Sequence, residues 1–127
     1  MKKVIVFSQL DQDILQRLQA QYEVVMINPK QGDVNEQIRE QVKNADAMIG
    51  AGRLLNQSNL APAEQLKIIS SVSVGYDNYD LAFLNQKKIW LSNTPHVLTE
   101  TTADLAFTLL MSAARKVPHL DQWTKQG

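Results

Sequence analysis

Short, uninterrupted apolar runs alternate along this chain with stretches whose apolar residues recur at helical spacing, and this alternation restricts the possible folds more than any other feature. Runs of the first kind, typical of strands covered on both faces, are Val4–Phe7, Val24–Ile27 and Ala47–Gly50. Between them, the apolar positions within 10–22 and 34–42 predict amphipathic helices. A β-α-β-α rhythm with short connections predicts a parallel sheet with helices on both faces.

The same rhythm continues in the second half of the chain. Two further apolar runs predict a fourth strand over Lys67–Val74 and a fifth over Lys88–Leu91, with a short helix at 80–86 between them. No repeat, linker or low-complexity segment interrupts the pattern. The sequence therefore predicts an α/β fold built on a five-stranded parallel sheet.

The C-terminal segment departs from this rhythm. Residues 99–116 predict one long helix with Thr99 as its cap, because the polar residues fall mostly in a column four apart: Glu100, Asp104, Thr108, Ser112 and Lys116. The rest of its circumference is apolar, so we expect burial on more than one face, against another domain or subunit. A shorter segment, His119–Lys125, follows. The predicted division is a domain over 1–98 and a long helix with a crossover over 99–127.

Composition excludes several functional classes. Lys and Arg together number 13, as do Asp and Glu, so no net charge attracts nucleic acid or an anionic membrane. The absence of cysteine excludes disulfides and thiolate metal sites. The N-terminal apolar run is too short for a signal peptide, and no window approaches the roughly 20 apolar residues of a membrane span. A cytoplasmic location with no membrane partner is the expectation.

The stretch SVSVGYDNYD, residues 71–80, places a glycine directly after an apolar strand. In an open parallel sheet, ligands bind beyond the carboxyl ends of the strands, where Val74 and Gly75 are predicted to lie. A glycine there lets backbone N–H groups approach an anion closely. The alternative is that Gly75 only supplies a turn with positive φ, completed by Asp77 and Asn78. Both interpretations remain open at this point.

The same stretch, followed by NTPHVLTETTADLAFTLLMSAAR at 93–115, resembles the substrate-domain signature of the D-2-hydroxyacid dehydrogenases. The resemblance spans essentially the whole chain and is strongest from Lys67 to Gly127. Within that family, the sequence is most similar to the glyoxylate/hydroxypyruvate reductases and 2-ketogluconate reductases. The resemblance implies a flavodoxin-like or Rossmann-like domain that faces a nicotinamide-binding domain across a cleft.

By this resemblance, the substrate is a small 2-oxo acid, the cofactor is NADP or NAD, and the full-length enzyme is a homodimer. The N–H groups of Val74 and Gly75 would hold the substrate carboxylate, an arrangement that fixed amides suit. The loop with Gly52 and Arg53 ends the third strand at the same rim, so we expect it to line the substrate pocket, where Arg53 either meets an anionic substrate or remains solvated. Thr102 matches a position that commonly contacts the nicotinamide end of the cofactor.

The family's catalytic arginine, histidine and carboxylate come from the cofactor domain, which the resemblance places beyond Gly127. His96 therefore has no implied catalytic role, and His119 has no neighbours at metal-ligand spacing, so no catalytic residue and no metal site is predicted. Gly50 and Gly52 begin a G-x-G pattern, but Leu55 stands where the third glycine of a dinucleotide loop would be. We expect half of an active site, inactive by itself, in a truncated chain.

Two alternatives belong to other classes. The chain could be a stand-alone flavodoxin-like binding or dimerisation module, with the apolar helix 99–116 as its contact surface. A response-regulator receiver has a similar rhythm and length, but it needs acidic residues after the first strand, where Phe7 and Ser8 stand. It also needs a lysine after the last strand, where the chain reads Leu91, Ser92 and Asn93. The receiver is therefore disfavoured.

Overall fold

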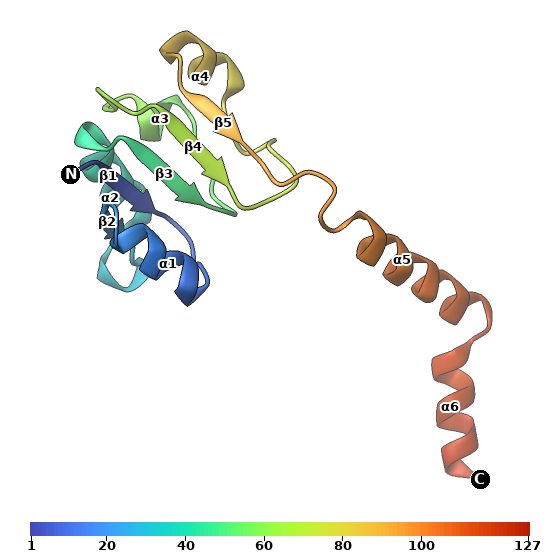
Figure 1. Cartoon of the computed structure of the whole chain (residues 1–127). Coiled ribbons are helices and arrows are strands. Elements are labelled where there is room, and N and C mark those ends of the chain that lie inside the picture. The colour runs from blue at the N-terminus through green and yellow to red at the C-terminus, as the bar shows by residue number, and fades with distance from the viewer. The chain divides into compact units, whose positions relative to one another are not determined.

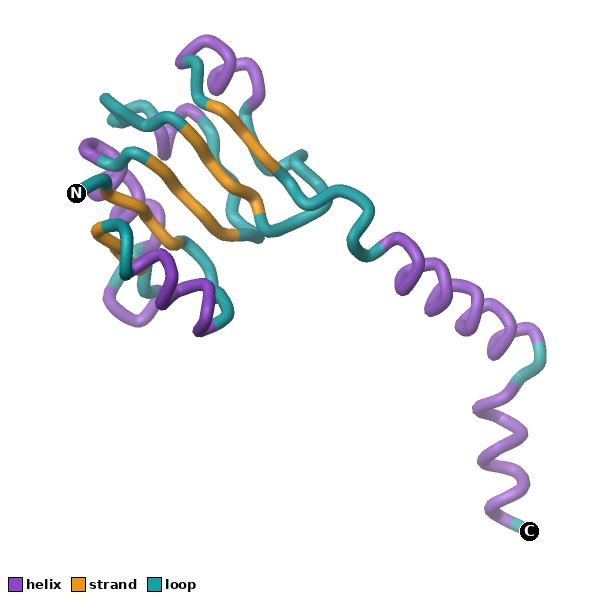
Figure 2. The backbone as a smooth tube through the Cα atoms, viewed as in Figure 1, coloured by secondary structure: helices purple, strands orange, loops and turns teal.

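The computed structural model describes residues 1–127 and divides by its internal contacts into two units, residues 1–95 and 96–127. Figure 1 labels the elements, and Figure 2 separates strands from helices and loops. The domain bounds expected from the sequence, 1–98 and 99–127, stay a prediction.

The first unit contains a five-stranded, entirely parallel sheet, as the sequence predicts (Figure 2). Its spatial order is β2-β1-β3-β4-β5. The strands are β1 (Lys3–Val6), β2 (Glu23–Met26), β3 (Ala47–Gly50), β4 (Ile68–Ser71) and β5 (Trp90–Ser92). This is the order of a doubly wound, flavodoxin-like sheet.

The fourth strand is shorter than expected. The prediction extended it to Val74, but β4 ends at Ser71. Its neighbour β3 ends at Gly50, whose carbonyl accepts the last ladder bond on that side, from the amide of Val72 at 2.9 Å. Beyond this point β4 has no partner on the β3 side, so Val74 lies in a loop. The fifth strand also starts later than predicted, at Trp90.

Helices join the strands on both faces of the sheet. The connection α1 (Gln12–Gln19) leads from β1 to β2, and α2 (Val34–Gln41) leads from β2 back across β1 to β3. Since crossovers between parallel strands are right-handed, connections that run in opposite directions lie on opposite faces. The remaining helical segments of the unit are η1 (Pro29–Gln31), η2 (Val42–Asn44), α3 (Gln57–Leu60) and α4 (Leu81–Lys87).

Some of these helical segments were missed because their signals are short. The four-residue helix α3 is fixed by a capping box, in which Asn56 accepts from the amide of Ser58 and the side chain of Asn59 accepts from the amide of Asn56. Such a short segment has no apolar periodicity to reveal it. The 3-10 segment η1 likewise depends on a local bond from the amide of Lys30 to Asn28.

The core lies mainly on the face covered by α2, α3 and α4. Fully buried side chains there include Ile5, Met48 and Ile69 from the sheet and Ile38 from α2. The other face is covered only in part, because Trp90 at the β5 edge is 77% exposed. The expectation that helices cover both faces holds over β1, where every side chain is buried, and not at β5.

The second unit consists of α5 (Thr99–Ala114) and α6 (Val117–Gln126). Thr99 was expected to cap α5, but the capping position is Leu98 and no side chain bonds the first turn. The helix ends at Ala114 rather than at residue 116, since Lys116 adopts a left-handed conformation with φ 53°. No side chain of α5 or α6 is buried. No helix of the structure is long and apolar enough to span a membrane.

Candidate functional site

Three loops leave the carboxyl ends of β3, β4 and β5, at 51–55, 72–80 and 93–95, at the rim where open parallel sheets bind ligands. Hydrogen bonds join the first two loops. The amide of Leu55 donates to the carbonyl of Asn78 at 2.8 Å, and the amide of Asp80 donates to the carbonyl of Leu55 at 3.2 Å. The side-chain amide of Asn78 also donates to the carbonyl of Arg53. Residues 52–53 and 74–75 are thus held at one rim.

Val74 and Gly75 are exposed, and their amides donate to no other group of the chain. Gly75 is not among the residues with positive φ, so the interpretation of this glycine as a positive-φ turn is wrong. A Cβ at Gly75 would meet only Oδ2 of Asp77, at an ordinary contact distance of 3.7 Å. Neither backbone conformation nor internal packing therefore requires glycine here. Room for a ligand beside the backbone remains as a reason for it.

The carbonyl groups of Ser73, Val74 and Gly75, in contrast, are all bonded. The carbonyl of Ser73 accepts from the amide of Thr94 at 2.9 Å, and that of Val74 accepts from Nδ2 of Asn93 at 2.8 Å. The carbonyl of Gly75 accepts from Oγ of Ser73 at 2.9 Å. Sequence reasoning missed Asn93 and Ser73, although a polar pair directly after an apolar strand is a signal that could have drawn attention to Asn93.

Gly52 and Arg53 lie on the loop after β3. Gly52 is exposed and has φ 70°, a conformation that favours glycine, and a Cβ there would meet nothing within 4 Å. Arg53 is half-buried, and its side chain makes no hydrogen bond or ion pair. It lines a cavity of about 570 Å³ together with Ser8 and Asn28, among others. A free cation thus borders an open space at the rim.

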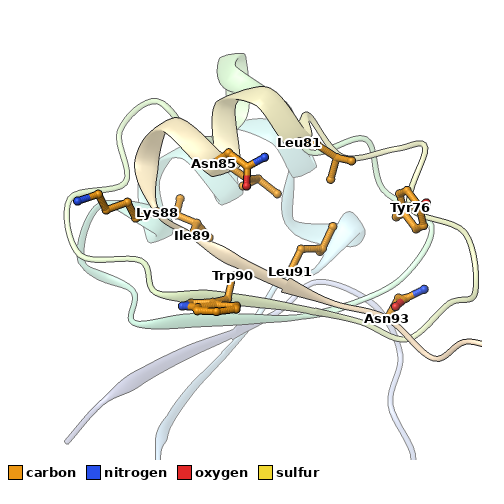
Figure 3. Close-up of a pocket in the computed structure, with 9 residues that line it drawn as sticks. Tyr76, Leu81, Asn85, Lys88, Ile89, Trp90, Leu91 and Asn93 are labelled. Atoms are coloured by element: carbon orange, nitrogen blue, oxygen red, sulfur yellow. The ribbon is translucent and has the colours of Figure 1, made fainter.

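A larger cavity, of about 740 Å³, runs along the free edge of β5 beneath α4 (Figure 3). Tyr76 and Asn93 lie at one end of it and Lys88 at the other. Its walls are mostly apolar, with Leu81 and Leu91 among them, and neither Val74 nor Gly75 lines it. Val74 and Gly75, whose amides are unbonded, therefore lie outside this larger cavity.

The remaining candidate residues lie in the second unit. Thr102 is exposed in α5, and its amide donates to the carbonyl of Leu98 at 2.9 Å. His96 has a positive φ of 65°, and the side chains of His96 and His119 are exposed with no hydrogen-bond partner. No group of three or more metal-ligating side chains gathers anywhere in the chain.

The G-x-G pattern of Gly50 and Gly52 does not form a dinucleotide loop. Leu55, at the position of the third glycine, is fully buried in the core, and both its amide and its carbonyl are bonded to the β4 loop. In a dinucleotide loop that glycine opens a helix, whereas here the position forms an isolated parallel bridge with Tyr79.

The sheet order is that of a doubly wound α/β domain, and its carboxyl-end rim carries the unbonded amides of Val74 and Gly75. The family model of the D-isomer specific 2-hydroxyacid dehydrogenase, catalytic domain, matches residues 4–119. The chain belongs to this family of oxidoreductases. The match confirms the resemblance seen in the sequence and does not favour a stand-alone module.

Curated relatives cover nearly all of this chain. It is 34% identical over 127 residues to a probable 2-ketogluconate reductase of Dictyostelium discoideum, spanning 99% of this chain and 38% of the relative. It is 35% identical over 124 residues to glyoxylate/hydroxypyruvate reductase B of Citrobacter koseri, spanning 98% and 38%. The chain therefore spans about two-fifths of the length of the relatives that it matches.

A solved structure agrees with these matches. The NADPH-dependent glyoxylate/hydroxypyruvate reductase of Sinorhizobium meliloti, in complex with NADP and malonate, is 28% identical and has a TM-score of 0.73. The alignment covers 99% of this chain and 38% of that protein. At this identity the likeness extends beyond a shared fold to the family.

Proposed function

We propose that this chain supplies the substrate-binding part of an NAD(P)H-dependent reductase of small 2-oxo acids, of the glyoxylate, hydroxypyruvate or 2-ketogluconate type. The observation that carries the proposal is the pair of exposed, unbonded amides at Val74 and Gly75. The names of the relatives support the substrate class, and family membership supports the type of reaction.

Backbone amides suit the role of holding a carboxylate. They present fixed N–H dipoles to an anion, and a charge-assisted hydrogen bond is roughly twice as strong as a neutral one. Holding the carboxylate also orients the adjacent carbonyl carbon, so that hydride and proton donors can meet it in a defined geometry. The contribution of this chain is then binding and orientation, with Val74 and Gly75 as the anchor.

Arg53 is the proposed second contact. Its side chain is half-buried and unpaired beside the 570 Å³ cavity, and the β4 loop is bonded to its carbonyl. A guanidinium there would attract an anionic substrate before the amides bind it. Gly52, on the same loop, lets the backbone follow the cavity wall with positive φ.

We assign only one cofactor contact to this chain. The buried Leu55 leaves the loop of Gly50 and Gly52 unsuited to a pyrophosphate, so no contact with the cofactor's phosphates is assigned to this chain. When bound, the nicotinamide supplies the hydride. Thr102 is proposed to contact its nicotinamide end, by analogy with the family. The choice between NADP and NAD depends on the residues that contact the 2′-hydroxyl or 2′-phosphate of the cofactor, and no residue of this chain is assigned to that contact.

A homodimer is the proposed assembly of the full-length enzyme. Within the second unit, large apolar side chains are exposed, among them Leu105, Phe107 and Trp123. Exposed apolar area of this extent is typical of an interface. Residues 1–127 alone are proposed to be inactive.

The proposal is tested by titrating the ¹⁵N-labelled chain with sodium glyoxylate and following its amide resonances. We expect the Val74 and Gly75 signals to shift and saturate, because the anion would bond to them directly. Sodium chloride at matched ionic strength is the control. Equal shifts of the Val74 and Gly75 signals with both salts would overturn the proposed site. Shifts confined to residues that line the 740 Å³ cavity at the edge of β5 would overturn it as well.

A further inference from the structure

Two consecutive peptide units of the β4 loop are held through their carbonyl oxygens by adjacent residues at the end of β5. Thr94 donates its backbone amide to Ser73, and Asn93 donates its side-chain amide to Val74, at 2.9 and 2.8 Å. The N–H groups of the same two units, on Val74 and Gly75, are unbonded. The hydrogen bonds that these two peptide units make within the chain are therefore all accepted by their carbonyl oxygens.

Fixing a carbonyl also fixes the amide that follows it. A trans peptide is planar, and its C=O and N–H point in opposite directions. Because both donors come from the end of β5, the two carbonyls face β5, and the amides of Val74 and Gly75 face away from it. In the sheet order, β3 lies on that other side of β4, and the loop after β3 carries Arg53. Two successive amides on one side form an anion-binding concavity.

A third peptide unit is held in the same way by a side chain of the β4 loop itself. Oγ of Ser73 donates to the carbonyl of Gly75 at 2.9 Å, and it lies 2.7 Å from Oγ of Ser71, which is 3% exposed. The buried Ser71 hydroxyl thus anchors the hydroxyl that orients the Gly75 carbonyl. The amide of Tyr76, which completes this third unit, also donates to no group of the chain.

We propose that Asn93 and Ser73 are positioning residues that orient the unbonded amides of the β4 loop and so set the affinity for the substrate carboxylate. This proposal rests on the proposed function. Asn93 acts on the Gly75 amide through the Val74 carbonyl, and Ser73 acts on the Tyr76 amide through the Gly75 carbonyl. Neither side chain needs to touch the substrate.

The test uses the 127-residue chain and sodium glyoxylate as the probe. Asn93→Ala removes the donor to Val74, and we expect a roughly tenfold or greater loss of glyoxylate affinity, the scale of one hydrogen bond to a charged group. Asn85→Ala is the matched control, because Asn85 lies on α4 and makes no bond to the β4 loop. Urea unfolding of the same samples reports stability separately.

Ser73 provides a second, independent pair. Ser73→Ala removes the hydroxyl, so we expect weaker glyoxylate binding. Ser73→Thr keeps the hydroxyl, so we expect glyoxylate binding close to that of wild type. This pair decides the question if Asn93→Ala does not fold. Lower stability with unchanged affinity in the folded variants would overturn the positioning role and leave the proposed function intact. A wild-type chain whose Val74 and Gly75 signals ignore glyoxylate would instead overturn the proposed function.

Discussion

The ring of Phe7 occupies the space in which a side chain on Gly50 would begin. A Cβ at Gly50 would lie 2.7 Å from Cδ2 and 2.9 Å from Cγ of Phe7, closer than nonbonded carbon atoms approach. Phe7 is 2% exposed, so its ring cannot turn aside into solvent. This contact packs the ends of β1 and β3 together directly beneath the rim that carries Ser8 and Arg53.

Gly50→Ala should therefore destabilise the domain. We expect a loss of about 1–3 kcal/mol in the free energy of unfolding, the usual cost of overpacking a core. Urea denaturation measures it. Gly75→Ala is the matched control, because its Cβ meets only Asp77 at 3.7 Å and its φ is not positive, so its stability should stay within about 0.5 kcal/mol of wild type. Equal effects of the two substitutions would contradict the packing argument.

Gly75→Val should impair binding without unfolding the chain. The branched side chain would stand where an anion approaches the amides of the β4 loop, so we expect roughly tenfold or weaker glyoxylate binding. Amide resonance titration measures the affinity. Val72→Thr, at an exposed position of the same loop, should bind as wild type does. If Gly75→Val bound glyoxylate normally, the close-approach explanation of this glycine would fail.

Residues 1–127 alone should not reduce glyoxylate or hydroxypyruvate with NADPH or NADH. The reaction needs an acid to protonate the developing alkoxide. The side chains of His96 and His119 have no carboxylate partner, and neither is part of the β4 loop. Following NAD(P)H absorbance at 340 nm checks this expectation, with a buffer blank as the reference. Turnover above the blank would show that this chain contains an acid that the structure does not reveal.

Asp80 should stabilise α4 through its side chain. Its carboxylate accepts from the amide of Phe83 at 3.0 Å, whereas Asp11, at the same position before α1, makes no such bond. We expect Asp80→Ala to cost about 1 kcal/mol of unfolding free energy, and Asp11→Ala to cost clearly less. Thermal and urea unfolding of both variants test the difference. A similar loss in each would mean that charge at the helix start, rather than the cap bond, is responsible.

The sequence predicted the sheet well because each strand is a separate apolar run. The prediction that β4 extends to Val74 was wrong, because β4 ends where its neighbour β3 ends. The sequence of β4 alone does not contain that information. The prediction placed Thr99 as a cap on residue type alone, although the chain enters the helix one residue earlier, at Leu98. Local patterns indicate elements, but their ends depend on partners.

The candidate site likewise combines features that the sequence predicts with features that depend on neighbouring strands. Val74 and Gly75 were selected by their place after a strand and by resemblance, and Gly52 and Arg53 by their place after the third strand. Hydrogen bonds between the β3 and β4 loops hold all four residues at one rim. The role proposed for Asn93 could not be inferred from the sequence, because its bond to Val74 joins residues 19 positions apart. Such a bond exists only once β4 and β5 are paired.

Tyr79→Phe should leave the domain as stable as wild type or slightly more stable. Tyr79 is 5% exposed, and its hydroxyl is buried without a hydrogen-bond partner, which is an unfavourable environment for a polar group. Removing the hydroxyl keeps the ring in the core and abolishes the desolvation cost, so we expect a gain of between zero and about 1 kcal/mol by urea unfolding. Tyr76→Phe is the control, because the Tyr76 side chain is half exposed and its hydroxyl has no such cost to relieve. A loss of stability confined to Tyr79→Phe would show that the buried hydroxyl has a partner in solution, for which an ordered water is the natural candidate.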